Sequence, residues 1–344
     1  MKDLTKTFKS GHALPMPQVR IKTEKGKTRR ETLLEVYRHK NIGYIPNLFL
    51  DYNFLVPKYM NEHPGFESGK DWFGVEWTYM PEQQSSSLTP GCAPIISDIE
   101  DWQNQVTFPD LDSVDWEKCA AEETACWDRK NRMSMIMIEN GIFERSQHLL
   151  GFENAVVDML VEPEDYEDLL DALTDFKCHV LEILGTYYKP DIVMCHDDYG
   201  TNKTMMMSPE KWREVFKPRI KRLVDTAHKY GMFYEHHSCG YITPIVGDLV
   251  DIGVDSLNPL QVCNDLPAIK EKYGSQLTLV GGFDSQGHLD NTDIPKKEIR
   301  ADVKRAYDTL APGGAYVSLP IAINYSNFAL PVVMEHYKIA KDYA

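Results

Sequence analysis

The feature that most restricts the fold of this 344-residue chain is a regular alternation of segments from residue 131 onward. Short apolar segments predict strands near 133–138, 191–195, 231–236, 254–257, 277–281 and 315–319. Longer segments between and after them predict helices at 162–188, 208–229, 244–251, 266–273, 294–310 and 328–343. Strands that alternate with helices in this way pair in parallel, because each helix crosses over one face of the sheet.

Two further apolar segments, near 44–50 and 72–79, bring the predicted strands to eight. Eight β/α units over this length fit an α/β protein with a (β/α)8 TIM barrel. A doubly wound open sheet is the alternative, but no Gly-rich dinucleotide motif follows any predicted strand. We therefore expect a polar arm at 1–28 and a single barrel domain at 29–344. The irregular stretch at about 51–130 is expected to be an insertion that elaborates the N-terminal part of the barrel.

The composition limits the partners and the compartment. With 52 acidic and 37 basic residues, the net charge of −15 opposes binding to nucleic acid or to an anionic membrane. No segment approaches the ~18–20 apolar residues of a membrane span, and the first residues do not read as a signal peptide. Seven cysteines without a C-x-x-C pair fit reduced thiols, not a disulfide framework or a zinc ribbon. We expect a cytoplasmic protein, and we leave its oligomeric state, a homodimer included, open.

Polar side chains able to bind a metal or move a proton follow nearly every predicted strand. They are Asn47, Glu139, His196, Asp197, Asp198, Tyr199, His236, His237, Cys239, Asn258, Asp284 and Gln286. In (β/α)8 barrels the chemistry is located at the C-terminal ends of the strands. We therefore expect these side chains to converge on that end, which we call the barrel mouth.

His237 and Cys239 form the most specific pair among these residues. Residues two apart in an extended segment point to the same side, so an imidazole nitrogen and a thiolate sulfur can reach one ion. Zn²⁺ accepts both ligand types, at ~2.0–2.1 Å to nitrogen and ~2.3 Å to sulfur. His236 offers an adjacent imidazole. The alternative is a buried strand end with a polar histidine and an inert cysteine.

The acidic candidates also have structural alternatives. Asp197 and Asp198 could cap the loop that follows their strand. Glu139 could be an acid at the entry of a helix, and Asp284 could hold the Gly281-Gly282 turn. Cys263 fits a small buried apolar residue better than a ligand.

Five segments carry a resemblance to a known family. They read MCHDDYGT at 194–201, followed by SPEKW at 208–212, HSCG at 237–240, and GIFER at 141–145 followed by LGFEN at 150–154. Their combination resembles the uroporphyrinogen decarboxylase superfamily over about residues 130–344. The resemblance implies a (β/α)8 barrel, in agreement with the strand count.

Two departures indicate the branch of this superfamily. The segment 45–50, IPNLFL, lacks the arginines with which the decarboxylase itself holds the carboxylates of its substrate, which argues against tetrapyrrole decarboxylation. HSCG instead resembles the corrinoid-dependent methyltransferases, in which that His and Cys, with a further Cys near the last strand, hold zinc. Residues 316–325, YVSLPIAINY, contain no Cys. Members that activate the thiol coenzyme M keep that Cys, so its loss favours the O-demethylase branch.

The resemblance therefore implies zinc at His237 and Cys239 and cobalamin carried by a separate corrinoid protein. The implied reaction moves a methyl group from a small methoxylated donor, which we expect to be aromatic, to the cob(I)alamin of that partner. The third zinc ligand stays open among His236, Glu139, Asp197 and Asp284.

Roles for the other residues follow from this chemistry. An acid that assists the leaving phenolate is expected among Asp198, Glu139, Asp197 and Asp284. Substrate contacts are expected from Asn47, Tyr199, His196, Asn258 and Gln286. Three alternatives remain, namely a metal-free lyase acting on a carboxylated substrate, a methylcobalamin:thiol methyltransferase and a non-catalytic corrinoid-binding protein. The last is disfavoured because the chain lacks the Asp-x-His-x-x-Gly signature of cobalamin binding.

Overall fold

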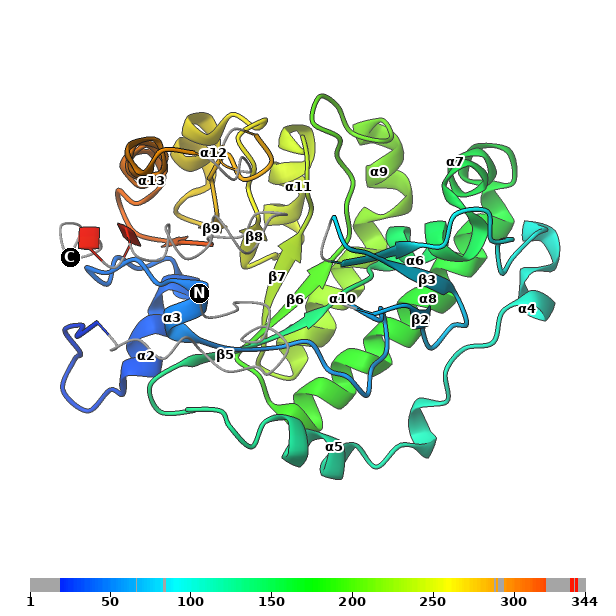
Figure 1. Cartoon of the computed structure of the whole chain (residues 1–344), viewed down its shortest axis with the longest axis horizontal. Helices are drawn as coiled ribbons and strands as arrows, with labels where there is room; N and C mark the ends of the chain where they lie inside the picture. The colour runs from blue at the N-terminus through cyan, green and yellow to red at the C-terminus, as the bar shows by residue number, and fades with distance from the viewer. Residues whose placement is uncertain are drawn as a thin grey trace.

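The computed structural model describes residues 19–65, 67–82, 85–287, 289, 294–319, 335–336 and 338–339. A seven-stranded sheet in the order β1-β5-β6-β7-β8-β9-β10 runs through the middle of the molecule (Figure 1). Its strands are β1 (Tyr52–Leu55), β5 (Met133–Ile138), β6 (Ile192–His196), β7 (Phe233–His237), β8 (Ser256–Asn258), β9 (Thr278–Val280) and β10 (Tyr316–Val317). The residues of these strands are mostly buried, as expected where helices cover a parallel sheet.

All neighbouring strands of this sheet pair in parallel. A further parallel bridge joins Asn47, just before β1, to Ser318, just after β10. There the Ser318 amide donates to the Pro46 carbonyl at 2.8 Å and the Leu48 amide donates to the Ser318 carbonyl at 3.2 Å. The two edges of the curled sheet thus come together, as they do in a barrel. The predicted α/β class and the TIM-barrel-like arrangement are confirmed.

The first two predicted strands were wrong. The segment 44–50 contributes only the bridge at Asn47 and then turns into the short helix α3 (Leu48–Asp51). The strand β1 follows at once, inside the stretch predicted to be an insertion. The predicted strand at 72–79 overlaps β3 (Glu76–Met80), which pairs antiparallel with β2 (Gly69–Lys70) and β4 (Ser85–Leu88) in a separate sheet. An apolar pattern identifies a strand but not its partner, which explains the error.

Helices cover the outside of the parallel sheet, as Figure 1 shows for α8, α10 and α13. The described helices after β5 are α6 (Ile142–Leu150), α7 (Phe152–Val161), α8 (Pro163–Ile183), α9 (Pro209–Val215), α10 (Lys217–Lys229), α11 (Val246–Asp251), α12 (Leu266–Tyr273) and α13 (Lys296–Leu310). Before β5 lie α2 (Arg29–Leu34), α4 (Trp102–Gln105) and α5 (Trp116–Glu123). Short 3₁₀ or π turns occur at Glu35–Arg38, Ile99–Asp101, Leu111–Ser113, Leu184–Tyr188 and Thr243–Ile245.

A buried ionic cluster fastens the N-terminal elaboration to the barrel helices. Arg145 of α6 donates to Asp71 at 2.6 Å and to the carboxylate of Glu62 at 3.0 Å. Lys177 of α8 also pairs with Glu62, and all four side chains are almost completely buried. Because each charge has an opposite partner, the cluster avoids the cost of an isolated buried ion.

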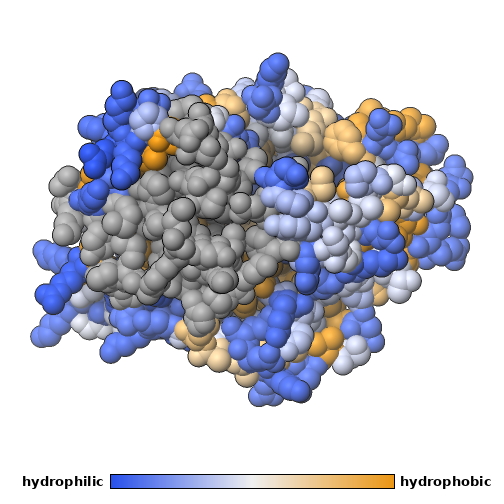
Figure 2. All heavy atoms as spheres, viewed as in Figure 1, coloured by the Kyte–Doolittle hydropathy of each residue, from blue (hydrophilic) through white to orange (hydrophobic). Residues whose placement is uncertain are grey.

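The face in Figure 2 is mostly hydrophilic where its residues are described, in keeping with the charged composition. Exposed apolar side chains occur on α7, where Phe152, Val157, Leu160 and Val161 keep 51–63% of their surface. They form the largest exposed apolar group on any one described helix.

Several predictions fall outside the described residues. They are most of the arm at 1–28, most of the helix at 328–343 and the loop at 320–325. Within the part of the chain that the structure describes, no helix combines the length and apolar character needed to cross a membrane.

Candidate functional site

The strand ends come together at the barrel mouth as the sequence predicted. β5 to β9 are parallel, so the residues that follow them lie at the same end of the sheet. In the register, His196 pairs with His237, and His237 pairs with Asn258. The rings of His196 and His237 stack with centroids 3.9 Å apart and planes at 19°. Two imidazoles and an adjacent amide are therefore fixed side by side by three neighbouring strands.

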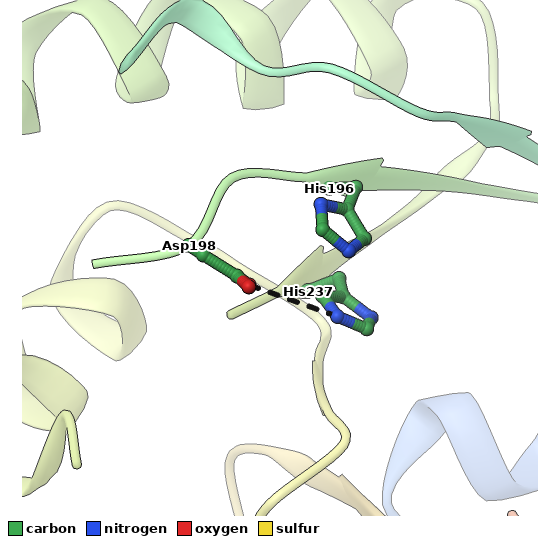
Figure 3. Close-up of side chains that lie close together, drawn as sticks. All are labelled: His196, Asp198 and His237. Carbon is green, nitrogen blue, oxygen red and sulfur yellow. Dashed lines mark ion pairs between the residues drawn. The ribbon is translucent and has the colours of Figure 1, made fainter. Parts of the chain in front are cut away.

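Asp198 completes a compact group with these imidazoles (Figure 3). One potential ligand atom from each of His196, Asp198 and His237 lies within 4.8 Å of the other two. The Nε2 atom of His237 is 3.8 Å from Oδ1 of Asp198 and 3.5 Å from Sγ of Cys239. Imidazole nitrogens and a carboxylate oxygen thus form the compact group, and the sulfur of Cys239, which is not part of that group, contacts His237. Donors of these three kinds suit zinc.

Two glycines hold the loops that carry Asp198 and Cys239 against each other. A Cβ atom on Gly200 would lie 2.6 Å from the Tyr241 amide nitrogen. On Gly240, whose φ is +81°, it would lie 2.4 Å from the Gly200 carbonyl carbon. This close approach lets the Cys239 amide donate to Oδ1 of Asp198 at 2.6 Å. The carboxylate is therefore oriented by the same loop that carries the thiol.

The site is partly buried, and this shifts its proton affinities. Burial raises the pKa of Asp198 to about 6, although the nearby His196 opposes the shift. Burial would lower the pKa of His196, but the carboxylates of Glu144, Asp198 and Asp197 outweigh it and raise its pKa to about 10. Burial and the charge of Asp198 raise the pKa of the Cys239 thiol well above its usual range. Metal binding at this thiol would therefore release a proton.

Glu144 was not among the candidates from the sequence, although GIFER contains it. Its Oε2 lies 2.7 Å from Nδ1 of His196, so this carboxylate fixes the ring next to His237. Gln261 and Asn264, in the loop after β8, were also missed. The side-chain oxygen Oε1 of Gln261 accepts from the Gly240 amide at 2.6 Å, and its side-chain nitrogen Nε2 lies 3.7 Å from Cys239 Sγ. The only signal for this loop was the Asn-Pro dipeptide that opens it.

Glu139 lies directly after β5 and is half-buried near the group. Burial, reinforced by the charge of Glu62, raises its pKa to about 8. Its Oε1 lies 3.7 Å from Nδ1 of His63, a ring that also accepts from the Gly65 amide at 2.9 Å. At neutral pH Glu139 is therefore mainly protonated and can supply a proton.

The contacts of Asp197 and Tyr199 stabilise the fold and do not point to a role in the chemistry of the barrel mouth. The Asp197 carboxylate accepts from the amides of Ile142, Phe143 and Glu144 at 3.0–3.3 Å, so it caps the start of α6. The Tyr199 hydroxyl donates to the same carboxylate, and the ring is completely buried. Asp197 thus has a structural role, but it caps the start of α6 and not the loop after its own strand. The complete burial of the Tyr199 ring removes the support for a substrate contact there.

His236 is corrected as a metal candidate. It alternates with His237 along β7, so its ring faces the opposite side of the sheet. There it stacks with Tyr199 at 5.8 Å and with Tyr234 at 6.4 Å. Burial lowers its pKa to about 3, and neither ring nitrogen has a hydrogen-bond partner among the described residues.

The predicted substrate contact at Asn47 is also corrected. Its Oδ1 accepts from the Phe49 amide at 3.0 Å, and its Nδ2 lies 3.4 Å from Ser318 Oγ. The side chain is completely buried and caps α3 at the closure of the sheet. A substrate cannot reach this amide without displacing the barrel closure.

Asp284 and Gln286 follow β9 at the correct end of the barrel. Asp284 is half-buried, and its carboxylate lies over Gly287, where an added Cβ would be 2.1 Å from Oδ1. Gln286 is exposed. The compact group found among the described residues includes neither side chain. This contact is with Gly287 and not with the Gly281-Gly282 turn of the structural alternative, and roles for Asp284 and Gln286 in the reaction stay predictions.

Comparisons with known proteins point in one direction. The family model described as "Uroporphyrinogen decarboxylase (URO-D)" matches residues 93–320. A curated relative, the "Methylcobamide:CoM methyltransferase MtaA" of Methanosarcina barkeri, is 26% identical over 110 residues. That match spans 31% of this chain and 32% of the relative, so about a third of each protein is compared.

A solved structure covers far more of the chain. The "methyltransferase from Methanosarcina mazei" superposes with a TM-score of 0.63 over 98% of this chain and 97% of that one, at 17% identity. At this identity the likeness shows a shared fold. It supports the barrel assignment over nearly the whole length of the molecule.

Proposed function

We propose that this chain, which belongs to the uroporphyrinogen decarboxylase family, is a zinc-assisted, corrinoid-dependent methyltransferase. The observation that carries the proposal is the group of His237, Cys239 and Asp198 at the mouth of a family barrel. The methyltransferase names of the curated relative and of the structural neighbour support the same class of reaction.

The residues at the mouth fit a zinc ion. Tetrahedral zinc with ~2.0–2.1 Å to nitrogen and ~2.3 Å to sulfur places these two donor atoms about 3.5 Å apart. The Nε2 atom of His237 and Sγ of Cys239 are 3.5 Å apart. We propose Asp198, with Oδ1 at 3.8 Å from the same nitrogen, as the third donor, although it was not among the residues that the sequence left open for this position. One thiolate and one carboxylate would together balance the charge of a dication.

The proposed donor is a small methoxylated, aromatic compound. When bound, zinc supplies Lewis acidity for the leaving oxygen. The methyl–oxygen bond breaks, the methyl group passes to the cob(I)alamin of a corrinoid protein, and the released oxygen needs a proton. Glu139 is the proposed proton donor, because its raised pKa keeps it protonated at neutral pH. His196, held by Glu144, would flank the reacting atoms with a positive charge.

The corrinoid protein is proposed to dock at the barrel mouth. The net charge of −15 favours a partner with a basic rim. Their association should then weaken as salt is added, since screening reduces the attraction between exposed charges. A complex whose affinity is unchanged between low and high salt would contradict this part of the proposal.

The test is spectroscopic. Reduced corrinoid protein, a methoxylated aromatic compound and this enzyme should convert the cob(I)alamin absorption to that of methylcob(III)alamin. His237→Ala should abolish the conversion, whereas His228→Ala, at an exposed histidine on α10, should leave it intact. Release of CO₂ from a carboxylated substrate without any corrinoid would establish the lyase alternative instead.

A second candidate function is methyl transfer in the opposite direction, from the methylated corrinoid to a thiol. The curated relative is named as a methyltransferase from methylcobamide to coenzyme M, so a thiol acceptor is the competing assignment. Methylcobalamin with coenzyme M or another small thiol distinguishes the two. Demethylation of methylcobalamin by a thiol, without any turnover of methoxylated compounds, would favour this candidate.

A further inference from the structure

Two buried polar atoms beside the candidate metal site lack partners. They are Nδ1 of His237 and Oδ1 of Asn258, neither of which has a hydrogen-bond partner among the described residues. The two residues are direct register partners at the ends of β7 and β8. A buried donor or acceptor without a partner costs free energy of folding. A hydrogen bond between these two atoms would remove that cost for both.

The orientation of the Asn258 amide is set from its other side. Its Nδ2 donates to Oε1 of Glu235 at 2.7 Å and lies 3.4 Å from Sδ of Met194. Because the two ends of an amide point in different directions, this contact with the NH₂ group fixes the orientation of the amide. The oxygen Oδ1 is therefore directed away from Glu235.

Glu235 is itself held in place inside the barrel. It is completely buried and accepts from the Tyr37 hydroxyl at 3.0 Å and from the Ser256 hydroxyl at 2.8 Å. Tyr37 is 3.0 Å from the hydroxyl of Tyr52 on β1. A continuous set of hydrogen bonds thus leads from the first strand of the sheet to Asn258.

We propose that Asn258, oriented by Glu235, is a positioning residue that selects the tautomer of His237. In this arrangement Nδ1 carries the proton and donates to Oδ1 of Asn258, and Nε2 keeps its lone pair. Nε2 is the atom that faces Sγ of Cys239 and Oδ1 of Asp198. The inference rests on the proposed function for the metal, and metal-binding histidines generally have such a partner on the second nitrogen.

The tautomer can be measured in the metal-free protein. Nitrogen NMR of ¹⁵N-histidine-labelled protein separates protonated from unprotonated ring nitrogens, and the His237 signals are those absent from His237→Gln. We expect protonated Nδ1 and unprotonated Nε2 in the wild type, and a mixture of tautomers in Asn258→Leu. A wild-type ring protonated on Nε2 would overturn the inference without any need for a stable variant.

Zinc affinity provides the second measurement. Asn258→Leu should weaken zinc binding about 10–100-fold, as is typical for the loss of such a partner. Ser256→Ala is the matched control, because it removes another buried hydrogen bond to Glu235 but leaves the Asn258 amide in place. Equal weakening in both variants would show a merely structural effect and overturn the inference. If the wild type binds no zinc, the proposed function fails, and the NMR result still decides the tautomer.

Discussion

At the scale of single residues, the candidate site depends most on Cys239. Its sulfur is the only thiol in contact with the imidazole of His237 among the described residues, at 3.5 Å. We expect Cys239→Ala to lower the zinc content of the purified protein from about one ion per chain to near zero, because a three-donor site does not survive the loss of its thiolate. Elemental analysis measures this.

Cys263 provides the control for this prediction. It is a half-buried cysteine in the neighbouring loop, and Cys263→Ala should keep the metal. Full zinc content in Cys239→Ala would show that the ion, if bound, is held elsewhere.

Glu139 makes the predicted reaction sensitive to pH. Its pKa of about 8 means that the proton donor is present below pH 8 and lost above it. We expect the rate of methyl transfer to fall as the pH rises through 8. Glu139→Gln should reduce the rate at pH 7 about 10²–10⁴-fold and remove this limb of the profile. An unchanged profile in the variant would assign the proton to another group.

Glu139 also predicts that the stability of the protein depends on pH, over a lower pH range than the rate. The folded protein holds this proton up to about pH 8, whereas an unfolded glutamate releases it near ~4.3. The free energy of unfolding therefore decreases as the pH rises between these two values. Urea denaturation should show Glu139→Gln to be more stable than the wild type at pH 9, and nearly equal to it at pH 4.

At the scale of elements, the start of α6 is tied to the loop after β6. The carboxylate of Asp197 accepts three amide hydrogen bonds there, and Gly141 approaches so closely that a Cβ would lie 2.2 Å from it. We expect Asp197→Ala to lower the free energy of unfolding by about 2–4 kcal/mol, since buried amides would lose their acceptor. Urea denaturation measures the difference.

Asp115 offers a matched comparison, because it caps the exposed start of α5 by accepting from the Lys118 amide at 3.1 Å. Asp115→Ala should cost only about 1 kcal/mol. Equal losses in the two variants would mean that the Asp197 contacts contribute no more than an ordinary surface cap.

At the scale of the whole molecule, the buried ionic cluster joins the N-terminal elaboration to the barrel. Arg145→Met would leave the carboxylates of Glu62 and Asp71 buried and short of a positive partner. We expect a loss of about 3–5 kcal/mol in the free energy of unfolding. The exposed ion pair of Arg213 with Asp248 is the control, and Arg213→Met should cost within about 1 kcal/mol. Comparable losses would show that the elaboration is held mainly by apolar packing.

The sequence was sufficient for the fold class and for the end of the molecule that carries the site. Alternating strands and helices allow little else than a parallel sheet, and parallel strands place all their C-terminal ends together. The period of two along a strand was also sufficient to put His237 and Cys239 on one side. These are local properties, because each depends on chain geometry over a few residues.

The tertiary structure decided what depends on contacts between distant segments. It placed the first strand at Tyr52–Leu55, and it brought Asp198 rather than His236 to His237, through two glycines that no spacing rule connects. It also paired Glu144 with His196 and placed Asn258 beside His237 in the strand register. Such contacts depend on strand register and on the close approach of separate loops. Neither is encoded in the pattern of any single segment, so only the folded chain fixes them.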